Sequence, residues 1–290
     1  MREALFGLEL LWHDAVSAAD TEHAGAIRIA AAQVPQALER PVRARGLWQV
    51  SDEGALFCMP RLLRLRVVGG QRVDHQREAG AGDDDLRAFV LGAALPMLLQ
   101  QRGLRVLRGT AVSLDGQALV LIGPSSGGKS TVGAALLQQG ARLVSDGWVV
   151  VDVDADGGAW VRPGLPVLRM FGDALDALGW SAEAVVPTRR ACGGFQVAVS
   201  SVVERAVPVR AFAVLDAVRG RGEVTRQHGL QRVATLSSES PLLDLQPRSH
   251  IAAVMRDMGR VVERVPLLGI QRGDLTALET ARRLSEASGR

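Results

Sequence analysis

The nonapeptide Gly123–Thr131, GPSSGGKST, contains the single lysine of the chain. The sequence has 34 Lys plus Arg, so every basic position other than Lys129 is an arginine. Gly123, four further residues and then Gly128-Lys129-Ser130 satisfy the pattern G-x-x-x-x-G-K-[ST] of a phosphate-binding loop. Lysine is a compact point charge, whereas the planar guanidinium group is too bulky for this cradle. A chain that otherwise uses arginine therefore still needs lysine here.

The segments on either side of the loop favour the same interpretation. Residues 116–122, GQALVLI, form an apolar run typical of a buried strand, and residues 131–140, TVGAALLQQG, are typical of a helix that ends at a glycine. In this strand–loop–helix order, backbone N–H groups and the helix N-terminus bind phosphate. The predicted nucleotide-binding residues are Gly123, Pro124, Ser125, Ser126, Gly127, Gly128, Lys129, Ser130 and Thr131. A glycine-rich turn that binds no nucleotide is the alternative.

Composition narrows the class of protein. With 290 residues, of which 47% are hydrophobic, the chain can bury a large core. No window approaches the roughly 18 apolar residues of a membrane span, and the N-terminus carries charges where a signal peptide is apolar, so we expect a cytoplasmic protein without a membrane partner. Cys58 and Cys192 lack close metal-ligand neighbours, which argues against a zinc site or a disulfide framework. The net charge of +3 comes from scattered arginines, so nucleic acid is not an expected partner.

Two domains are expected along the chain. Residues 1–82 contain short alternating stretches separated by turns, which predicts a small β-rich N-terminal domain. Residues 83–290 contain the loop and predict an α/β domain. A helix is predicted over Leu86–Gln101, with a kink at Pro96, and a strand over Val209–Asp216.

Three turns between strands are predicted, at Asp115-Gly116, Asp146-Gly147 and Ala155–Gly158. Near the C-terminus, apolar residues recur at helical spacing after Ser249, which we expect to be the N-cap of a helix. This stripe is expected to face the core and consists of Ile251, Val254, Met255, Met258, Val261, Val262 and Val265.

The loop and its surroundings resemble a known family. Residues 102–152, RGLRVLRGTAVSLDGQALVLIGPSSGGKSTVGAALLQQGARLVSDGWVVVD, and residues 161–170, VRPGLPVLRM, are similar to the catalytic domain of the HPr kinase/phosphorylase family, and closest to its short relatives such as lasso-peptide precursor kinases. The similarity continues more weakly through residues 210–217 and 264–279 and into the N-terminal region. It implies ATP, magnesium and transfer of the γ-phosphoryl group to a serine hydroxyl. It also implies a P-loop kinase core of the HPr kinase/phosphoenolpyruvate-carboxykinase type.

The chain departs from the family pattern at two positions. The family usually has a histidine before the Gly-Thr-Ala-Val segment and two adjacent aspartates after the second strand, where this chain has Arg108 and Asp146-Gly147. Asp146 is expected to bind magnesium or to deprotonate the acceptor hydroxyl. Gly147 is either part of a hairpin turn or an altered active-site position. Arg108 either clamps phosphate or is simply exposed.

The expected catalytic residues are therefore Asp146, Lys129 and Arg108, and the expected magnesium ligands are Ser130 and Asp146. Weaker candidates for charge stabilisation are Arg162, Arg189 and Arg190.

The leading hypothesis is an ATP- and Mg²⁺-dependent kinase that phosphorylates a hydroxyl group, expected to be serine, of a peptide or small protein such as a natural-product precursor. The first alternative is a nucleotide-binding regulatory or scaffold protein of the same fold that has lost transfer activity. The second is a small-molecule kinase, because a P-loop does not define the acceptor. The acceptor, the nucleotide preference and the oligomeric state stay open.

Overall fold

The structure is a computed structural model, and it describes residues 2–13, 25–180, 185–187, 194–216 and 220–289. Its contacts divide the chain into two units: unit 1 comprises residues 1–104 and 241–251, and unit 2 comprises residues 105–240 and 252–290. Residues 83–104 thus belong to unit 1. The division into domains at residue 82 stays a prediction.

Unit 1 is built around one eight-stranded sheet of order β1-β2-β3-β8-β7-β6-β5-β4. The strands are β1 Arg2–Leu5, β2 Leu8–His13, β3 Ile27–Ala31, β4 Arg43–Arg45, β5 Trp48–Ser51, β6 Gly54–Met59, β7 Leu63–Val68 and β8 Arg72–Arg77. In β7, Leu63, Leu65 and Val67 are buried and alternate with more exposed residues, as expected for a strand with one face on a core. The predicted β-rich character of this region agrees with the sheet.

A helical segment follows the sheet of unit 1, as α1 Asp83–Phe89, the π-helical turn η2 Val90–Ala94 and α2 Leu95–Gln101. The helix predicted over Leu86–Gln101 is therefore present. The irregular turn ends two residues before Pro96, which has no backbone N–H to donate to a preceding carbonyl. The 3₁₀ turn η5 Leu243–Leu245 completes unit 1, where Gln100 donates from its side chain to the Pro241 carbonyl.

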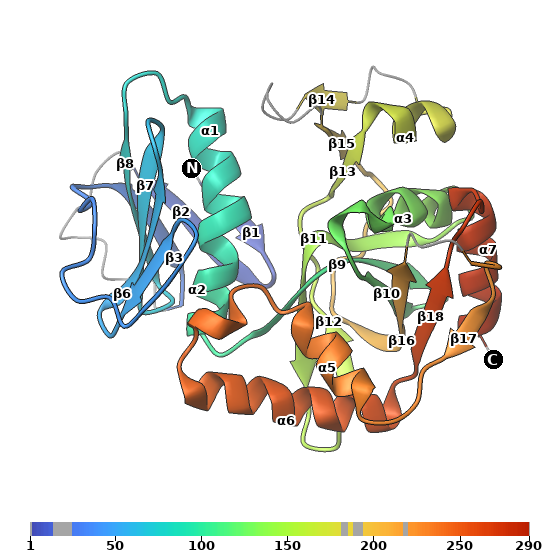
Figure 1. Cartoon of the computed structure of the whole chain (residues 1–290). Coiled ribbons are helices and arrows are strands. Elements are labelled where there is room, and N and C mark those ends of the chain that lie inside the picture. Colours follow the sequence, from blue (N-terminus) through green and yellow to red (C-terminus); the bar gives the residue numbers. More distant parts are fainter. Residues whose placement is uncertain (1, 14–24, 181–184, 188–193, 217–219, 290) are drawn as a thin grey trace. The chain divides into compact units, whose positions relative to one another are not determined.

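Unit 2 contains a seven-stranded mixed sheet of order β10-β9-β11-β12-β16-β18-β17, in which β10 also pairs with β16 (Figure 1). A three-stranded sheet of order β13-β15-β14 accompanies it. The strands are β9 Arg105–Leu114, β10 Gln117–Ile122, β11 Arg142–Val153, β12 Ala159–Val161, β13 Val167–Phe171, β14 Val185–Pro187, β15 Gly194–Ala198, β16 Val207–Asp216, β17 Val224–Arg226 and β18 Leu267–Gln271. The strand predicted over Val209–Asp216 is β16.

Helices α3 Lys129–Gln138 and α7 Ala277–Ser288 pack together on the sheet of unit 2. Their buried side chains, among them Val132 and Leu284, join one core cluster with Leu121 and Leu215 of the strands. Because β10, β16 and β18 run parallel, their C-terminal ends lie at one edge, and residues 123–128 follow β10 there. Helix α4 Gly172–Ala177 follows β13.

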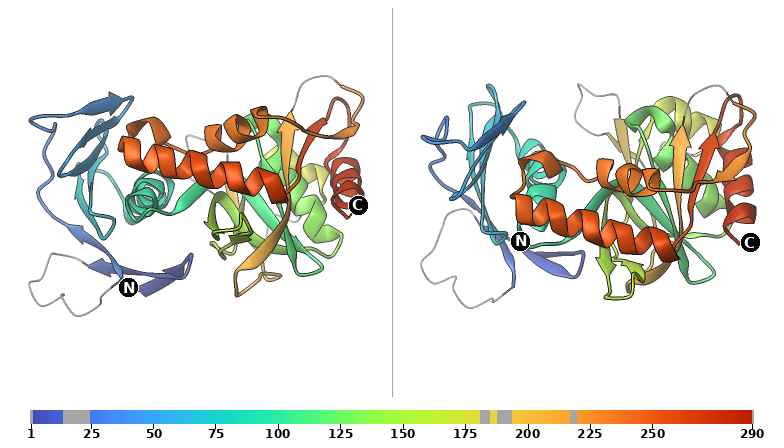
Figure 2. Two further views of the ribbon diagram at one scale, coloured as in Figure 1. Left: turned by 90° about the horizontal axis from the view of Figure 1, so that it is seen from below. Right: turned by 60° about the horizontal axis from the view of Figure 1, so that its bottom comes forward.

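Helices α5 Gln231–Ser238 and α6 Arg248–Arg264 lie side by side in both views of Figure 2. The Arg232 side chain of α5 donates to the Val262 carbonyl of α6. Most of the predicted stripe on α6 is buried, including Val254, Met258 and Val261, but Met255 is 40% exposed. The helix begins at Arg248, so the predicted N-cap, Ser249, is already inside it.

Two of the three predicted turns are present, and the third is not. Asp115 and Gly116 join β9 to β10 with positive φ angles at both residues, as a tight hairpin requires. Residues 155–158 join β11 to β12, also as predicted. The turn predicted at Asp146-Gly147 is wrong, because β11 runs without interruption from Arg142 to Val153. Strand β9 pairs with β11 at that dipeptide and on both sides of it, so the chain continues as a strand there.

Candidate functional site

The phosphate-loop sequence lies between β10 and α3, in the strand–loop–helix order that was predicted. Residues Ser125–Gly127 form a 3₁₀ turn, and Gly128, with a φ of 76°, directly precedes the helix. A Cβ atom on Gly123 would lie 2.5 Å from the Leu215 carbonyl oxygen of β16. Only glycine allows this approach, so β16 fixes the start of the loop.

Lys129 is the first residue of α3, and its side chain turns back into the loop. Its ammonium Nζ donates to the carbonyl oxygens of Gly123 at 2.7 Å and Pro124 at 2.8 Å. The residue is only 8% exposed. Burial lowers the pKa of Lys129. The negative charges of Glu239 and Asp146 raise this pKa, and the positive charge of Arg108 lowers it further. The lysine is thus a cation held within the loop, close to two carboxylates.

Asp146 of β11 accepts three hydrogen bonds. Its Oδ1 accepts from the hydroxyls of Thr110, at 2.5 Å, and Ser130, at 2.8 Å, and its Oδ2 accepts from the backbone N–H of Arg169 at 2.8 Å. Burial raises the pKa of Asp146, and these hydrogen bonds and the charge of Arg169 oppose the rise. The two predicted magnesium ligands, Ser130 and Asp146, are therefore in direct contact although they belong to different elements.

Gly147 lies opposite Gly109 in the pairing of β11 with β9 and has a φ of 86°. A Cβ atom on Gly147 would lie 3.6 Å from a guanidinium nitrogen of Arg169. At the position where the family pattern has a second aspartate, this chain therefore has a glycine without a side chain, and the Arg169 guanidinium lies beside it. Of the two interpretations left open for Gly147, the hairpin turn is excluded, since the residue lies within a strand.

Arg108 of β9 is exposed and lies opposite Trp148 of β11. Its guanidinium carbon is 5.6 Å from the centroid of the Trp148 ring, which is the geometry of a cation–π contact. Its charge acts on the pKa values of both Lys129 and Glu239, so the side chain lies near the loop without an ion pair to Asp146. Arg108 is thus both exposed and close to the loop, so the structure is compatible with either of its two interpretations.

Three residues at the loop were not predicted: Arg169, Glu239 and Arg272. Arg272 donates to the Gly127 carbonyl oxygen at 3.0 Å, and burial lowers its pKa. The charge of Glu239 acts on the pKa of Lys129, and the Glu239 backbone carbonyl accepts from the Arg108 N–H at 2.8 Å. No local motif marks these three positions. The resemblance passes through the segments that contain Arg169 and Arg272, and it offered no signal for Glu239.

A pocket of about 530 Å³ opens beside the loop. Its polar lining residues include Lys129 and Ser130 with two arginines, Arg169 and Arg272. Besides further residues of the loop and α3, the lining contains mostly apolar residues of β13, α4 and the start of α7. They include Phe171, which is 61% exposed, and Leu278. A pocket whose lining combines a cationic, glycine-rich loop with apolar side chains has the chemistry of a nucleotide site.

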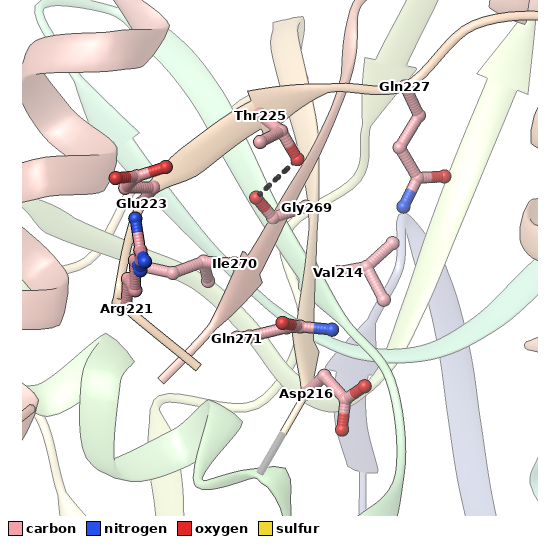
Figure 3. Close-up of a pocket in the computed structure, with 9 residues that line it drawn as sticks. All are labelled: Val214, Asp216, Arg221, Glu223, Thr225, Gln227, Gly269, Ile270 and Gln271. Carbon is pink, nitrogen blue, oxygen red and sulfur yellow. Dashed lines mark hydrogen bonds between the residues drawn. The ribbon is translucent and has the colours of Figure 1, made fainter. Parts of the chain in front are cut away.

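A second pocket, of about 470 Å³, lies over β16, β17 and β18 (Figure 3). Thr225 donates to the Gly269 carbonyl oxygen at its centre. The charged side chains on its rim are Asp216, Arg221 and Glu223, two acids and one base. These charges do not form the cationic cradle that a phosphate group needs, so we assign this pocket no part in phosphate binding.

The weaker arginine candidates are not part of the site as described. Arg162 makes a two-pronged ion pair with Asp152, at 2.7 and 2.8 Å, on the neighbouring strand. Arg189 and Arg190 lie outside the described residues. Within the residues the structure describes, no cluster of three or more His, Cys, Asp or Glu side chains could hold a metal ion. No helix in that part of the chain is long and apolar enough to cross a membrane.

Comparisons with known proteins give little support for an identity. No protein-family model matches the chain, and no curated protein matches it. Among solved structures, the chain is similar to the HPr(Ser) kinase/phosphatase of Coxiella burnetii, with 11% sequence identity and a TM-score of 0.35 over 63% of this chain and 90% of that one. At this score the likeness establishes neither the family nor the function of this protein.

Proposed function

We propose that the protein is an ATP- and Mg²⁺-dependent kinase that transfers the γ-phosphoryl group to a hydroxyl, with serine of a peptide or small protein as the acceptor. The observation that carries the proposal is that residues of a glycine-rich loop, its lysine and Ser130 line one pocket, while Asp146 accepts a hydrogen bond from Ser130 directly behind that lining. The proposal includes a cytoplasmic location, where ATP is supplied.

The residues present fit a nucleotide. The buried ammonium of Lys129 is paired only with loop carbonyls, which are neutral, so phosphate oxygens would be stronger partners for it. Arg169 and Arg272 add positive charge at the same end of the pocket. The apolar wall that contains Phe171 is suited to a nucleobase. We therefore assign the phosphates to the loop end and the base to the Phe171 end.

The residues also fit magnesium. Mg²⁺ is usually held by one or two protein oxygen ligands together with phosphate oxygens and water, so a site with only two protein ligands suffices. The Ser130 hydroxyl and the Asp146 carboxylate, 2.8 Å apart, supply these two ligands. The ion would neutralise charge on the phosphates during transfer. Thr110 and the Arg169 N–H keep Asp146 oriented toward Ser130.

One observation favours the non-catalytic alternative: Gly147 provides no second carboxylate, and Arg169 lies beside it. The test is to incubate the wild-type protein with Mg-ATP and serine-containing peptides encoded beside its gene, and to detect an added phosphate by mass spectrometry. Calorimetry with Mg-ATP runs in parallel. Binding with transfer supports the kinase, binding without transfer to peptide supports the regulatory protein, and transfer to small molecules alone supports a small-molecule kinase. Absence of binding refutes all three.

A further inference from the structure

Strand β17 is the free edge of the large sheet of unit 2. Within the residues that the structure describes, every other strand of that sheet has partners on both sides, because β10 also pairs with β16, whereas β17 pairs only with β18. A strand with a single partner presents the backbone N–H and C=O groups of alternate residues to solvent. These groups can pair with another extended chain.

Two residues of β17 direct their backbone groups away from β18. The Gln227 N–H donates to the Leu267 carbonyl oxygen at 2.8 Å, so Gln227 faces β18. Because backbone groups alternate in direction along a strand, Thr225 also faces β18, while Val224 and Arg226 face outward. Arg226 is exposed and Val224 is partly exposed. This edge therefore offers two N–H donors and two C=O acceptors.

A short edge strand is also a usual protection against unwanted pairing, so the edge alone does not identify a site. The second observation is the pocket of about 470 Å³ beside it, whose lining includes Glu223, Thr225 and Gln227 (Figure 3). Alternate residues of a strand lie on one face of a sheet, so the pocket runs along β17 on that face. Its lining also contains Gly269, where a Cβ atom would lie 3.0 Å from the Gln227 side-chain nitrogen. A glycine at this position keeps the pocket open.

The chemistry of the pocket favours a polar or basic side chain of a ligand. Its lining combines hydroxyl, amide and carboxylate groups, and the acids Asp216 and Glu223 outnumber the single base, Arg221. The neighbouring residues Leu215 and Leu268 instead belong to the apolar core cluster that includes side chains of α3 and α7. The pocket therefore lies on the face of the sheet that these helices leave uncovered.

The pocket lies next to the phosphate loop. The Arg272 N–H donates to the Asp216 carbonyl oxygen at 3.0 Å, and the Arg272 side chain donates to the Gly127 carbonyl oxygen at 3.0 Å. Asp216 and Gln271 line the second pocket, while Arg272 lines the pocket beside the loop. The Gly222 N–H donates to the Gln271 carbonyl oxygen at 3.1 Å, so the segment leading into β17 lies at this same end of β18.

We propose that the acceptor peptide binds as an additional strand along β17, with a polar or basic side chain in the second pocket, and presents its serine at the loop. This inference rests on the proposed kinase function. An added strand lies three strand spacings, roughly 14 Å, from β16, whose Leu215 carbonyl oxygen lies against Gly123 of the loop. Extended chain covers this distance in about four residues, so the paired segment lies about four to six residues from the serine.

Arg226→Pro tests the backbone contact. Proline removes the outward N–H of residue 226 and places its ring at the edge, but it takes no hydrogen bond from the pairing with β18, because that N–H points away from β18. Arg226→Ala is the matched control, since it loses the same side chain and keeps the N–H. The comparison of the two variants therefore isolates the ability of the edge to pair.

The probe is a serine-containing peptide encoded beside the gene that the wild-type protein phosphorylates. We expect the KM for this peptide to be at least about tenfold higher in Arg226→Pro than in Arg226→Ala, because a backbone hydrogen bond and the close approach of the two strands are lost. The affinity for Mg-ATP, measured by calorimetry, should be the same in both variants. A peptide cut to three residues on each side of the serine should no longer distinguish them.

Hydrogen exchange gives a second measurement on the wild-type protein, which does not depend on whether Arg226→Pro folds. The full-length peptide should slow exchange of the Val224 and Arg226 amides, and Mg-ATP alone should not. Equal KM values in the two variants, or no slowing at these amides, would overturn the docking site and leave the kinase proposal standing. A wild-type protein that binds Mg-ATP but phosphorylates no peptide also overturns the docking site. Failure to bind Mg-ATP refutes the kinase proposal and this inference with it.

Discussion

In the proposed function, Lys129 is the residue on which phosphate binding depends. Its ammonium group is buried and pairs with two loop carbonyls, so its removal takes away the cation and leaves those carbonyls without it. We predict that Lys129→Ala lowers the affinity for Mg-ATP at least tenfold while the protein stays folded, because the side chain serves the loop and not the apolar core.

Lys129→Arg should also bind Mg-ATP poorly, since the larger planar guanidinium does not fit a position that is 8% exposed. Calorimetry gives both affinities, and circular dichroism checks the fold. Wild-type affinity in both variants would contradict the assignment of the loop.

The buried charge of Asp146 is needed for the proposed metal binding, but its burial lowers the stability of the folded protein. We predict that Asp146→Asn lowers phosphate transfer at least about 10²-fold. The same change should raise the midpoint of thermal unfolding at pH 7 by about 2–4 °C, the shift that about 1 kcal/mol produces in a domain of 150–250 residues. An asparagine can keep the contacts with Ser130, Thr110 and Arg169, because the two hydroxyls can turn to accept from its amide.

The pH dependence of this stabilisation has a definite sign. Burial raises the pKa of Asp146 above 3.8, so the folded protein binds the proton more tightly than the unfolded chain does. The buried charge therefore destabilises the wild type above the raised pKa, and this cost disappears as the pH falls toward 3.8. The advantage of Asp146→Asn should shrink over the same interval. A variant less stable than wild type at pH 7 would show that the hydrogen bonds outweigh the buried charge.

Gly147 tests whether a second carboxylate can be restored. Its φ of 86° is unfavourable for any residue with a side chain, at a cost of about 1–2 kcal/mol. An aspartate there would lie beside Arg169 and pair with it. We predict that Gly147→Asp destabilises the protein by about this amount and leaves transfer no faster than in wild type. Gly147→Ala isolates the backbone cost, and an increase in rate with Gly147→Asp would contradict the prediction.

At the scale of elements, the contact between α3 and β9 joins the loop to the metal ligands. A Cβ atom on Gly133 of α3 would lie 2.7 Å from Cγ2 of Thr110, the residue whose hydroxyl donates to Asp146. We predict that Gly133→Ala lowers the free energy of unfolding by about 1–3 kcal/mol, as overpacking of a well-packed core does, and also lowers transfer. Denaturant unfolding measures the first effect.

The control for this helix change is Gly259→Ala on α6, where the new methyl group has open space around it. Alanine favours a helix over glycine by about 0.8–1 kcal/mol, so this variant should be more stable than wild type and equally active. If Gly133→Ala behaved like Gly259→Ala, the close packing of α3 on β9 would be refuted.

At the scale of the whole molecule, the site residues named above all belong to unit 2. We predict that Mg-ATP slows hydrogen exchange in the loop, residues 123–131, and in the middle of β11, and has little effect on the sheet of unit 1. At a concentration of 100 times the Kd, ligand binding stabilises the folded state by about 2.7 kcal/mol, which is enough to be measured. Protection in unit 1 without protection of the loop would place the binding site elsewhere.

Local patterns predicted those elements whose geometry depends on neighbouring residues. The Asp115-Gly116 hairpin, β16 and the helix predicted over residues 131–140, which runs from Lys129 to Gln138, were all present, because turn chemistry and apolar periodicity act over a few residues. Asp146-Gly147 has the same turn chemistry as Asp115-Gly116, yet it lies inside β11. There, pairing with β9 on both sides outweighs the local preference, which no reading of the dipeptide could reveal.

The sequence by itself determined the loop, because glycines, a lysine and a serine at fixed spacing act within one turn of chain before a helix. It also named Ser130 and Asp146, but it did not determine that they touch. Only the tertiary structure brought Asp146, Arg169 and Arg272 to the loop, since strand pairing places residues that are far apart in the chain. The physical reason is that a residue's contacts across a sheet depend on which strands lie next to each other. That arrangement is determined by how the apolar side chains of the whole domain are buried, and not by the residues of one segment.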